Sequence, residues 1–118
     1  QDLMRSGVYF VQPNVCRVGG ATGMRRIMNL IDLNERVFAP HSWSSIICMT
    51  ANMHLMATVR KHYMLEYDIN PSAFREDLIL EPYPFKQGTY EIPDRPGFGL
   101  ELNMETVTRH TIYQTQVF

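Results

Sequence analysis

The chain has 118 residues, 45% of them hydrophobic and 19% charged, and its formal net charge at pH 7 is −1. This length suits one domain with its own core, or a part of a larger domain. The balanced charge, the absence of a long basic run and the shortness of the apolar stretches lead us to expect neither a nucleic acid nor a membrane as partner.

The first predicted unit is a strand followed by a helix. Residues 8–11 are rich in strand-forming side chains and precede Pro13, which predicts a buried strand that ends there. Gly19 and Gly20 mark a turn that needs positive φ. The following helix could begin at Thr22 as N-cap, or at Gly20 or Ala21. It is predicted from apolar residues at i, i+3, i+4 and i+7, which are Met24, Ile27, Met28 and Ile31.

Two further units repeat this plan. Residues 36–39 predict a second strand and residues 44–58 a second helix, and residues 62–67 predict a third strand followed by a short helix at 72–77. This order is typical of an α/β fold with parallel strands and right-handed crossovers. The residues expected to face inward from the second helix are Ile46, Met49, Met53, Met56 and Ala57.

The pattern changes in the last part of the chain. Residues 79–93 predict two short antiparallel strands around a turn at Gln87 and Gly88, and residues 104–109 predict a last helical turn or two. Three parallel strands do not close a barrel. We therefore expect either a small open α/β domain or the C-terminal part of a longer chain. Residues 2–6, followed by Gly7, predict the end of a helix. The non-methionine first residue and the start inside this predicted helix favour the second alternative.

The sulfur-containing residues predict core positions. Cys16 and Cys48 have no metal-ligand spacing, and we expect both to be buried, reduced thiols, consistent with a cytoplasmic protein. The eight methionines are interpreted as core residues.

His41 is the first candidate for chemistry. It directly follows Pro40 at the end of the second predicted strand, the position from which side chains of barrel enzymes reach the active site. A histidine can take up and return a proton near neutral pH. The alternative is a structural histidine held by hydrogen bonds.

Three segments give the chain a family resemblance. VQPNVCRVGGATGMRRI (11–27), APHSW (39–43) and IPDRPGFGLEL (92–102) resemble the enolase superfamily, in its mandelate racemase/muconate lactonizing branch, and most of all the acid-sugar dehydratases. The resemblance implies a modified TIM barrel with a capping domain. Residues 1–78 would be the C-terminal part of the barrel, about strands 6 to 8. Residues 79–118 would be a hairpin and tail that return to the capping domain.

The resemblance also implies the chemistry. A base removes the proton α to a carboxylate, and Mg²⁺ held by three carboxylates stabilises the enediolate. The metal ligands and a lysine pair would lie upstream of Gln1, in the N-terminal remainder of the same enzyme. The implied activity is dehydration of an acid sugar, a small-molecule carboxylate, to a 2-keto-3-deoxy acid by a homo-oligomer. The alternatives are a racemase or epimerase of a 2-hydroxy acid or acid sugar, and a catalytically impaired, carboxylate-binding homologue.

Asn14 departs from the family pattern, which implies an aspartate paired with His41. A carboxylate would stabilise the imidazolium, whereas an amide does so less. We expect Asn14 to accept a hydrogen bond from the ring and to make His41 a weaker base, acting as an acid or hydrogen-bond donor. Drift in an inactive homologue and an engineered substitution are the alternatives.

Four other residues complete the expected site. The resemblance implies that Glu66 binds the substrate carboxylate, for which it must be protonated; a surface ion pair with Arg60 or Lys61 is the alternative. Arg17 could polarise the mouth of the site or lie in a surface loop. Ser42 and Trp43 could line the pocket, although Trp43 could equally pack on the next helix.

Overall fold

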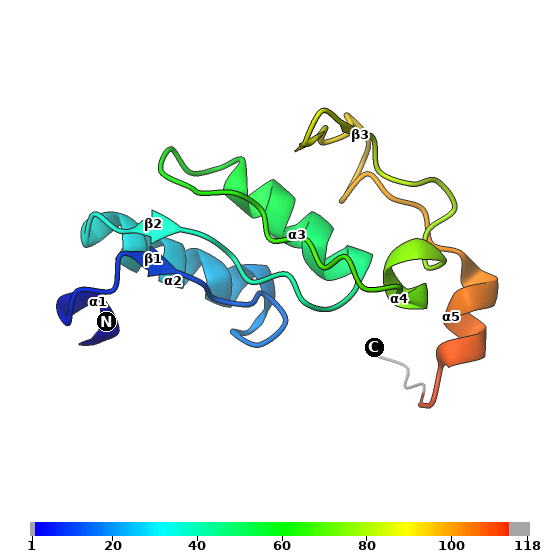
Figure 1. Ribbon diagram of the computed structural model, residues 1–118. Helices are drawn as coiled ribbons and strands as arrows, with labels where there is room; N and C mark the ends of the chain where they lie inside the picture. The colour runs from blue at the N-terminus through cyan, green and yellow to red at the C-terminus, as the bar shows by residue number, and fades with distance from the viewer. Residues whose placement is uncertain (1, 114–118) are drawn as a thin grey trace. The chain divides into compact units, whose positions relative to one another are not determined.

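The computed structural model describes residues 2–113 (Figure 1). The chain forms two compact units, Gln1–Ile69 and Asn70–Phe118. The division expected from the resemblance, with residues 1–78 in the barrel and residues 79–118 as a hairpin and tail, stays a prediction.

A parallel strand pair lies at the centre of the first unit. After the short helix α1 (Asp2–Arg5), β1 (Phe10–Val11) pairs in parallel with β2 (Val37–Phe38), and the helix α2 (Gly20–Leu33) connects the two strands and contacts β2 (Figure 1). The register places Phe10 opposite Val37. The parallel pairing predicted from the sequence is therefore confirmed.

The third predicted strand, residues 62–67, is largely wrong. Only His62 makes a bridge, to Phe38, with Tyr63 N–H donating to the Phe38 carbonyl at 2.9 Å. The next bond of a parallel ladder would need an N–H at position 40, and Pro40 has none. Residues 63–67 consequently form no strand and do not pair with β2.

The helix α2 begins earlier than a Thr22 cap would place it. Gly19 is the N-cap, with φ +86° and no side-chain capping bond, so Thr22 as N-cap is wrong and the start at Gly20 is confirmed. Gly23 lies in the first turn, where a Cβ atom would stand 1.7 Å from the Val18 carbonyl oxygen. This close approach packs the preceding loop directly on the helix.

The helix α3 (Ile46–Met56) is buried on nearly every side. Ser45 caps its N-terminus by accepting a hydrogen bond from Cys48 N–H at 3.4 Å. The expected inward positions are buried apart from Ala57, which is exposed because it follows the last helical residue. Six of the eight methionines are buried, as predicted: Met4, Met24, Met28, Met49, Met53 and Met56. The prediction is wrong for Met64 and Met104, which are 67% and 61% exposed.

The core of the first unit lies between these helices and the strand pair. Its buried residues come from the helices, from β2 and from the loop after β1: Met4, Val15, Met24, Met28, Ile31, Phe38, Cys48, Ala51, Leu55 and Met56. This core holds the C-terminal ends of β1 and β2 and the start of α3 in fixed places, which positions the loops described below.

The second unit contains a hairpin and two helices. The strands β3 (Phe85–Lys86) and β4 (Thr89–Tyr90) pair antiparallel around Gln87 and Gly88, which both have positive φ as a type I′ turn requires, so the predicted hairpin is confirmed. The helix α4 (Ala73–Glu76) precedes the hairpin. The helix α5 (Met104–His110) is capped by Asn103, which accepts from Glu105 N–H and Thr106 N–H.

Among residues 2–113, none of the helices combines the length and apolar character that crossing a bilayer requires.

Candidate active site

Two strand-end loops lie side by side in the first unit. The ladder between β1 and β2 continues past the strands, because Ala39 N–H donates to the Val11 carbonyl at 3.1 Å and His41 N–H donates to the Pro13 carbonyl at 3.0 Å. The loop after β2 is thereby fixed to the loop after β1. As a result, Asn14 and His41 come from neighbouring strand ends.

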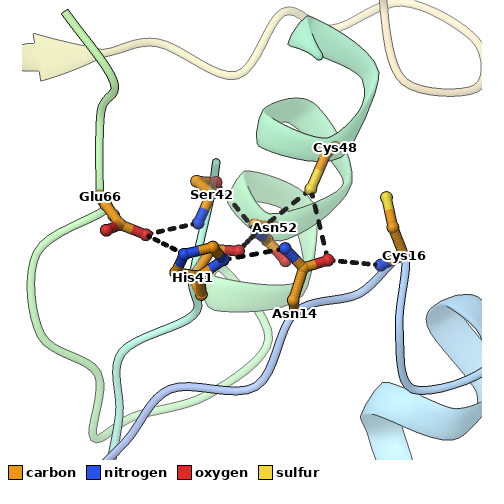
Figure 2. Close-up of polar contacts among 7 residues, drawn as sticks. All are labelled: Asn14, Cys16, His41, Ser42, Cys48, Asn52 and Glu66. Atoms are coloured by element: carbon orange, nitrogen blue, oxygen red, sulfur yellow. Dashed lines mark hydrogen bonds and ion pairs between the residues drawn. The ribbon is translucent and has the colours of Figure 1, made fainter. Parts of the chain in front are cut away.

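Asn14 and His41 form a hydrogen-bonded pair (Figure 2). Asn14 Nδ2 lies 2.9 Å from His41 Nδ1. Asn14 is 7% exposed, whereas the His41 side chain is 38% exposed, so the ring extends from a buried amide towards solvent. A substrate could reach the outer edge of the ring.

The orientation of the Asn14 amide is fixed by its other contacts. Its Oδ1 accepts the backbone N–H of Cys16 at 2.9 Å, and a backbone N–H can only donate. The Cys48 thiol lies 3.9 Å from the same oxygen. Burial, with a further contribution from neighbouring Cys16, raises the pKa of the Cys48 thiol from 9.0 to about 12, so this thiol keeps its proton and is a second donor to Oδ1.

This orientation determines where the proton of a neutral His41 lies. Because Asn14 presents Nδ2 to the ring, Nδ1 must be the hydrogen-bond acceptor, and the ring proton is on Nε2. The expectation that Asn14 accepts a hydrogen bond from the ring is therefore wrong: Asn14 donates. An aspartate would accept from Nδ1–H and leave Nε2 without a proton.

Glu66 lies on the other side of His41, as Figure 2 shows. Its Oε2 is 3.8 Å from His41 Nε2 and accepts the Ser42 backbone N–H at 2.7 Å. The carboxyl group is thus anchored by one oxygen, and within residues 2–113 no hydrogen bond is found to the other. Lys61 instead donates to the Glu35 carbonyl, which argues against the surface pairing of Glu66 with Lys61.

The remaining predicted residues divide into two groups. Ser42 is buried beside His41, whereas Arg17 is exposed and Trp43 is 63% exposed, so most of the Trp43 side chain faces solvent. Within the described residues, neither Arg17 nor Trp43 makes a hydrogen bond or ion pair with Asn14, His41 or Glu66.

Two residues of α3 escaped the sequence reasoning. The sequence predicts Cys48 only as a core residue and gives Asn52 no role. In the structure, Cys48 contacts Asn14 and Asn52 donates to the His41 carbonyl (Figure 2). Their spacing of four residues places them on one helix face, and an asparagine on that face, inside an otherwise apolar helix, was the available signal. The expectation that Cys16 is buried is wrong, because its thiol side chain is exposed; both cysteines are free.

The described residues do not fit a metal site. Among residues 2–113, no three His, Cys, Asp or Glu side chains lie together so that they could hold a metal ion. No step of the chemistry is therefore assigned to a metal bound by these residues.

Comparisons with known proteins agree on one family. Residues 1–107 match the family described as Enolase C-terminal domain-like. The chain is 28% identical to D-galactarolactone cycloisomerase of Agrobacterium fabrum, over 92% of the chain and 31% of that protein. It is 32% identical to D-xylonate dehydratase of Haloferax volcanii, over 98% of the chain and 28% of that protein. The chain therefore spans about three-tenths of the length of these relatives.

Solved structures share the arrangement. The 3,6-anhydro-D-galactonate cycloisomerase of Zobellia galactanivorans superposes with a TM-score of 0.82 at 27% identity, covering 92% of this chain and 31% of that one. The mandelate racemase/muconate lactonizing enzyme of Jannaschia sp. CCS1 gives a TM-score of 0.80 at 26% identity, covering 96% of this chain and 29% of that one. The backbone described above is therefore the C-terminal part of such a fold.

Proposed function

Since this chain belongs to the Enolase C-terminal domain-like family of the enolase superfamily, we propose that it forms part of a lyase that dehydrates an acid sugar. The relatives named above include a dehydratase and cycloisomerases. The proposed substrate is a sugar acid with a hydroxyl group β to the carbon that loses its proton, and the product is a 2-keto-3-deoxy acid.

The amide of Asn14 carries this proposal. It donates to His41 Nδ1, so the ring proton is on Nε2, the nitrogen that lies 3.8 Å from Glu66 Oε2. A ring nitrogen that already bears a proton does not act as a base. It can donate a hydrogen bond to a hydroxyl group that gains negative charge as its C–O bond breaks.

The reaction divides between this chain and the rest of the enzyme. A base outside this chain takes the α-proton. The β-hydroxyl leaves beside His41 as hydroxide that accepts a hydrogen bond from Nε2–H, and it takes up, through solvent, the proton that the base removed, so that water is lost overall and both groups return to their starting states. Glu66, anchored through Oε2, would bind the substrate carboxylate by donating a hydrogen bond from its other oxygen, which requires the protonated form of its carboxyl group. The Mg²⁺ ligands and the base are proposed to lie in the N-terminal remainder of the enzyme, which we propose to be cytoplasmic and homo-oligomeric. The free thiols support the proposed cytoplasmic location.

Asn14→Asp tests the proposal. The carboxylate accepts Nδ1–H, frees Nε2 and restores a base on this face of the substrate. We expect α-proton exchange from the His41 face, measured as deuterium uptake from D₂O, to rise, and dehydration of an acid sugar to fall.

The wild-type enzyme is the reference, assayed against a library of acid sugars. If wild-type enzyme dehydrates a sugar and the exchange rate of Asn14→Asp stays flat or falls, His41 is not restrained by Asn14. If wild-type enzyme epimerises instead, the racemase alternative replaces the proposal. Binding of carboxylates without turnover would support an impaired homologue.

A further inference from the structure

Asn52 is a polar residue in a place where stability alone favours an apolar one. It is fully buried, at 0% exposure, within the mostly apolar helix α3. Its Oδ1 has no hydrogen-bond partner among the described residues. A buried, unpaired amide oxygen costs free energy relative to a satisfied one. This cost indicates that Asn52 serves something other than the core.

The donors of Asn52 show what it serves. Nδ2 donates to the His41 carbonyl oxygen at 3.1 Å and to Ser42 Oγ at 3.0 Å (Figure 2). The carbonyl oxygen can only accept, so the orientation of this amide is fixed in the same way as that of Asn14. Asn52 thus connects the rigid helix α3 to the loop that carries His41.

A single peptide group receives two of these contacts. The C=O of the peptide between His41 and Ser42 accepts from Asn52, and the N–H of the same peptide donates to Glu66 Oε2 at 2.7 Å. In a trans peptide the C=O and the N–H point in opposite directions. Asn52 and Glu66 therefore hold this peptide from opposite sides, which fixes the backbone from which the imidazole extends.

We propose that Asn52 is a positioning residue: it fixes the peptide between His41 and Ser42, and through that peptide it sets the direction of the His41 ring and the place of Glu66. The inference deepens the proposed function, since these are the two groups assigned to the substrate. It adds a residue of α3 that does not touch the substrate.

The test compares Asn52→Leu with Thr50→Val in the full enzyme. Both positions are fully buried in α3, but Thr50 Oγ1 donates only within the helix, to the carbonyls of Ile46 and Ile47. Thr50→Val therefore reproduces the change in core polarity without touching the His41 loop.

We expect Asn52→Leu to lower kcat by about 10- to 100-fold, as a misplaced reacting group does, and to raise KM because Glu66 is displaced as well, with the melting temperature equal to or above that of wild type. Thr50→Val should keep the wild-type kcat. Amide hydrogen exchange at Ser42 and the ¹⁵N resonances of His41 should change in Asn52→Leu and not in Thr50→Val, whatever reaction the enzyme performs.

The results separate this inference from the proposed function. Unchanged Ser42 exchange and unchanged His41 resonances in Asn52→Leu would overturn the positioning role. So would a loss of kcat that follows the loss of melting temperature equally in both variants. An enzyme that dehydrates no acid sugar would refute the proposed function, while the exchange and resonance data would still decide the role of Asn52.

Discussion

An asparagine and an aspartate have nearly the same shape, but they place protons differently around a histidine ring. At position 14 the amide nitrogen faces His41 because a backbone N–H occupies the amide oxygen. Asn14 is therefore a hydrogen-bond donor to the ring, and Nε2 of His41 carries the ring proton. Replacing the amide nitrogen of residue 14 by an oxygen, with no change in the backbone, would make His41 Nε2 a base.

The oxygen of Asn14 depends on a thiol that stays protonated. Cys48 is 1% exposed, and burial is the main reason why the pKa of its thiol is raised to about 12. A thiolate at Cys48 would repel the amide oxygen of Asn14. The chain avoids that charge by excluding water from α3 at this point.

Cys48 makes the stability of the protein sensitive to alkaline pH. The folded thiol has the raised pKa, so its contribution is complete below the unfolded value near 9.0 and is lost as the pH rises towards about 12. Over that interval we expect the free energy of unfolding to fall by about 1.4 kcal/mol per pH unit from this group.

Urea unfolding at a series of pH values would measure this slope. Cys48→Ala should reduce the slope, whereas Cys16→Ala, at an exposed thiol, should keep most of it. Burial also raises the pKa of Tyr83, which adds the same background to every variant. Equal slopes in Cys48→Ala and wild type would mean that the thiol ionises freely in the folded state.

At the scale of elements, two helices have different tasks. The helix α2 covers the strand pair with an apolar face, as the spacing of its buried residues indicates. The helix α3 is buried on nearly every side; its buried Thr50 bonds within the helix, whereas its buried Asn52 reaches the loop of His41. The site is thus held from behind by a helix and from the side by a neighbouring strand end.

Gly23 is required by the close packing of the loop before α2. A methyl group there would stand 1.7 Å from the Val18 carbonyl oxygen, so backbone must move. We expect Gly23→Ala to destabilise the protein by about 3 kcal/mol, the upper end for overpacking, although alanine is the better helix former.

Thr22→Ala is the matched control. Thr22 is exposed in the same turn and makes no capping bond, so this change should stay within about 0.5 kcal/mol of wild type. Thermal unfolding of both variants checks the pair. A neutral Gly23→Ala would show that the loop relaxes freely, and a strongly destabilising Thr22→Ala would restore Thr22 as a cap.

At the scale of the whole molecule, the order of strands and helices could be predicted from the sequence because strand formers, turn residues and helical spacing repeat along the first unit. The third strand could not, because its loss follows from a missing N–H at Pro40 on its neighbour, which local patterns in residues 62–67 do not contain. The approach of Asn14, His41 and Glu66 was expected from their places after strands. The direction of the Asn14 hydrogen bond depended on Cys16 N–H, which residue types alone do not reveal.

The proposed requirement for Mg²⁺ also belongs to this scale. Family membership suggests Mg²⁺, but residues 2–113 contain no cluster to hold it. We expect EDTA to abolish turnover by the intact enzyme and Mg²⁺ to restore it, while the ¹⁵N resonances of His41 keep the pattern of an Nε2–H ring. Turnover that persists in EDTA would contradict the proposed division between this chain and the rest of the enzyme.

The amide at position 14 has a consequence for descent. Codons for asparagine and aspartate differ by one nucleotide at the first base, so a single mutation can exchange the donor for an acceptor without altering the volume of the side chain. Because Cys16 N–H and the Cys48 thiol can serve either side chain, the surroundings need no accompanying change. Under the proposed function, a lineage could therefore pass in one step between a His41 whose Nε2 donates a hydrogen bond and one whose Nε2 accepts a proton, and so between the proposed dehydration and its epimerisation alternative.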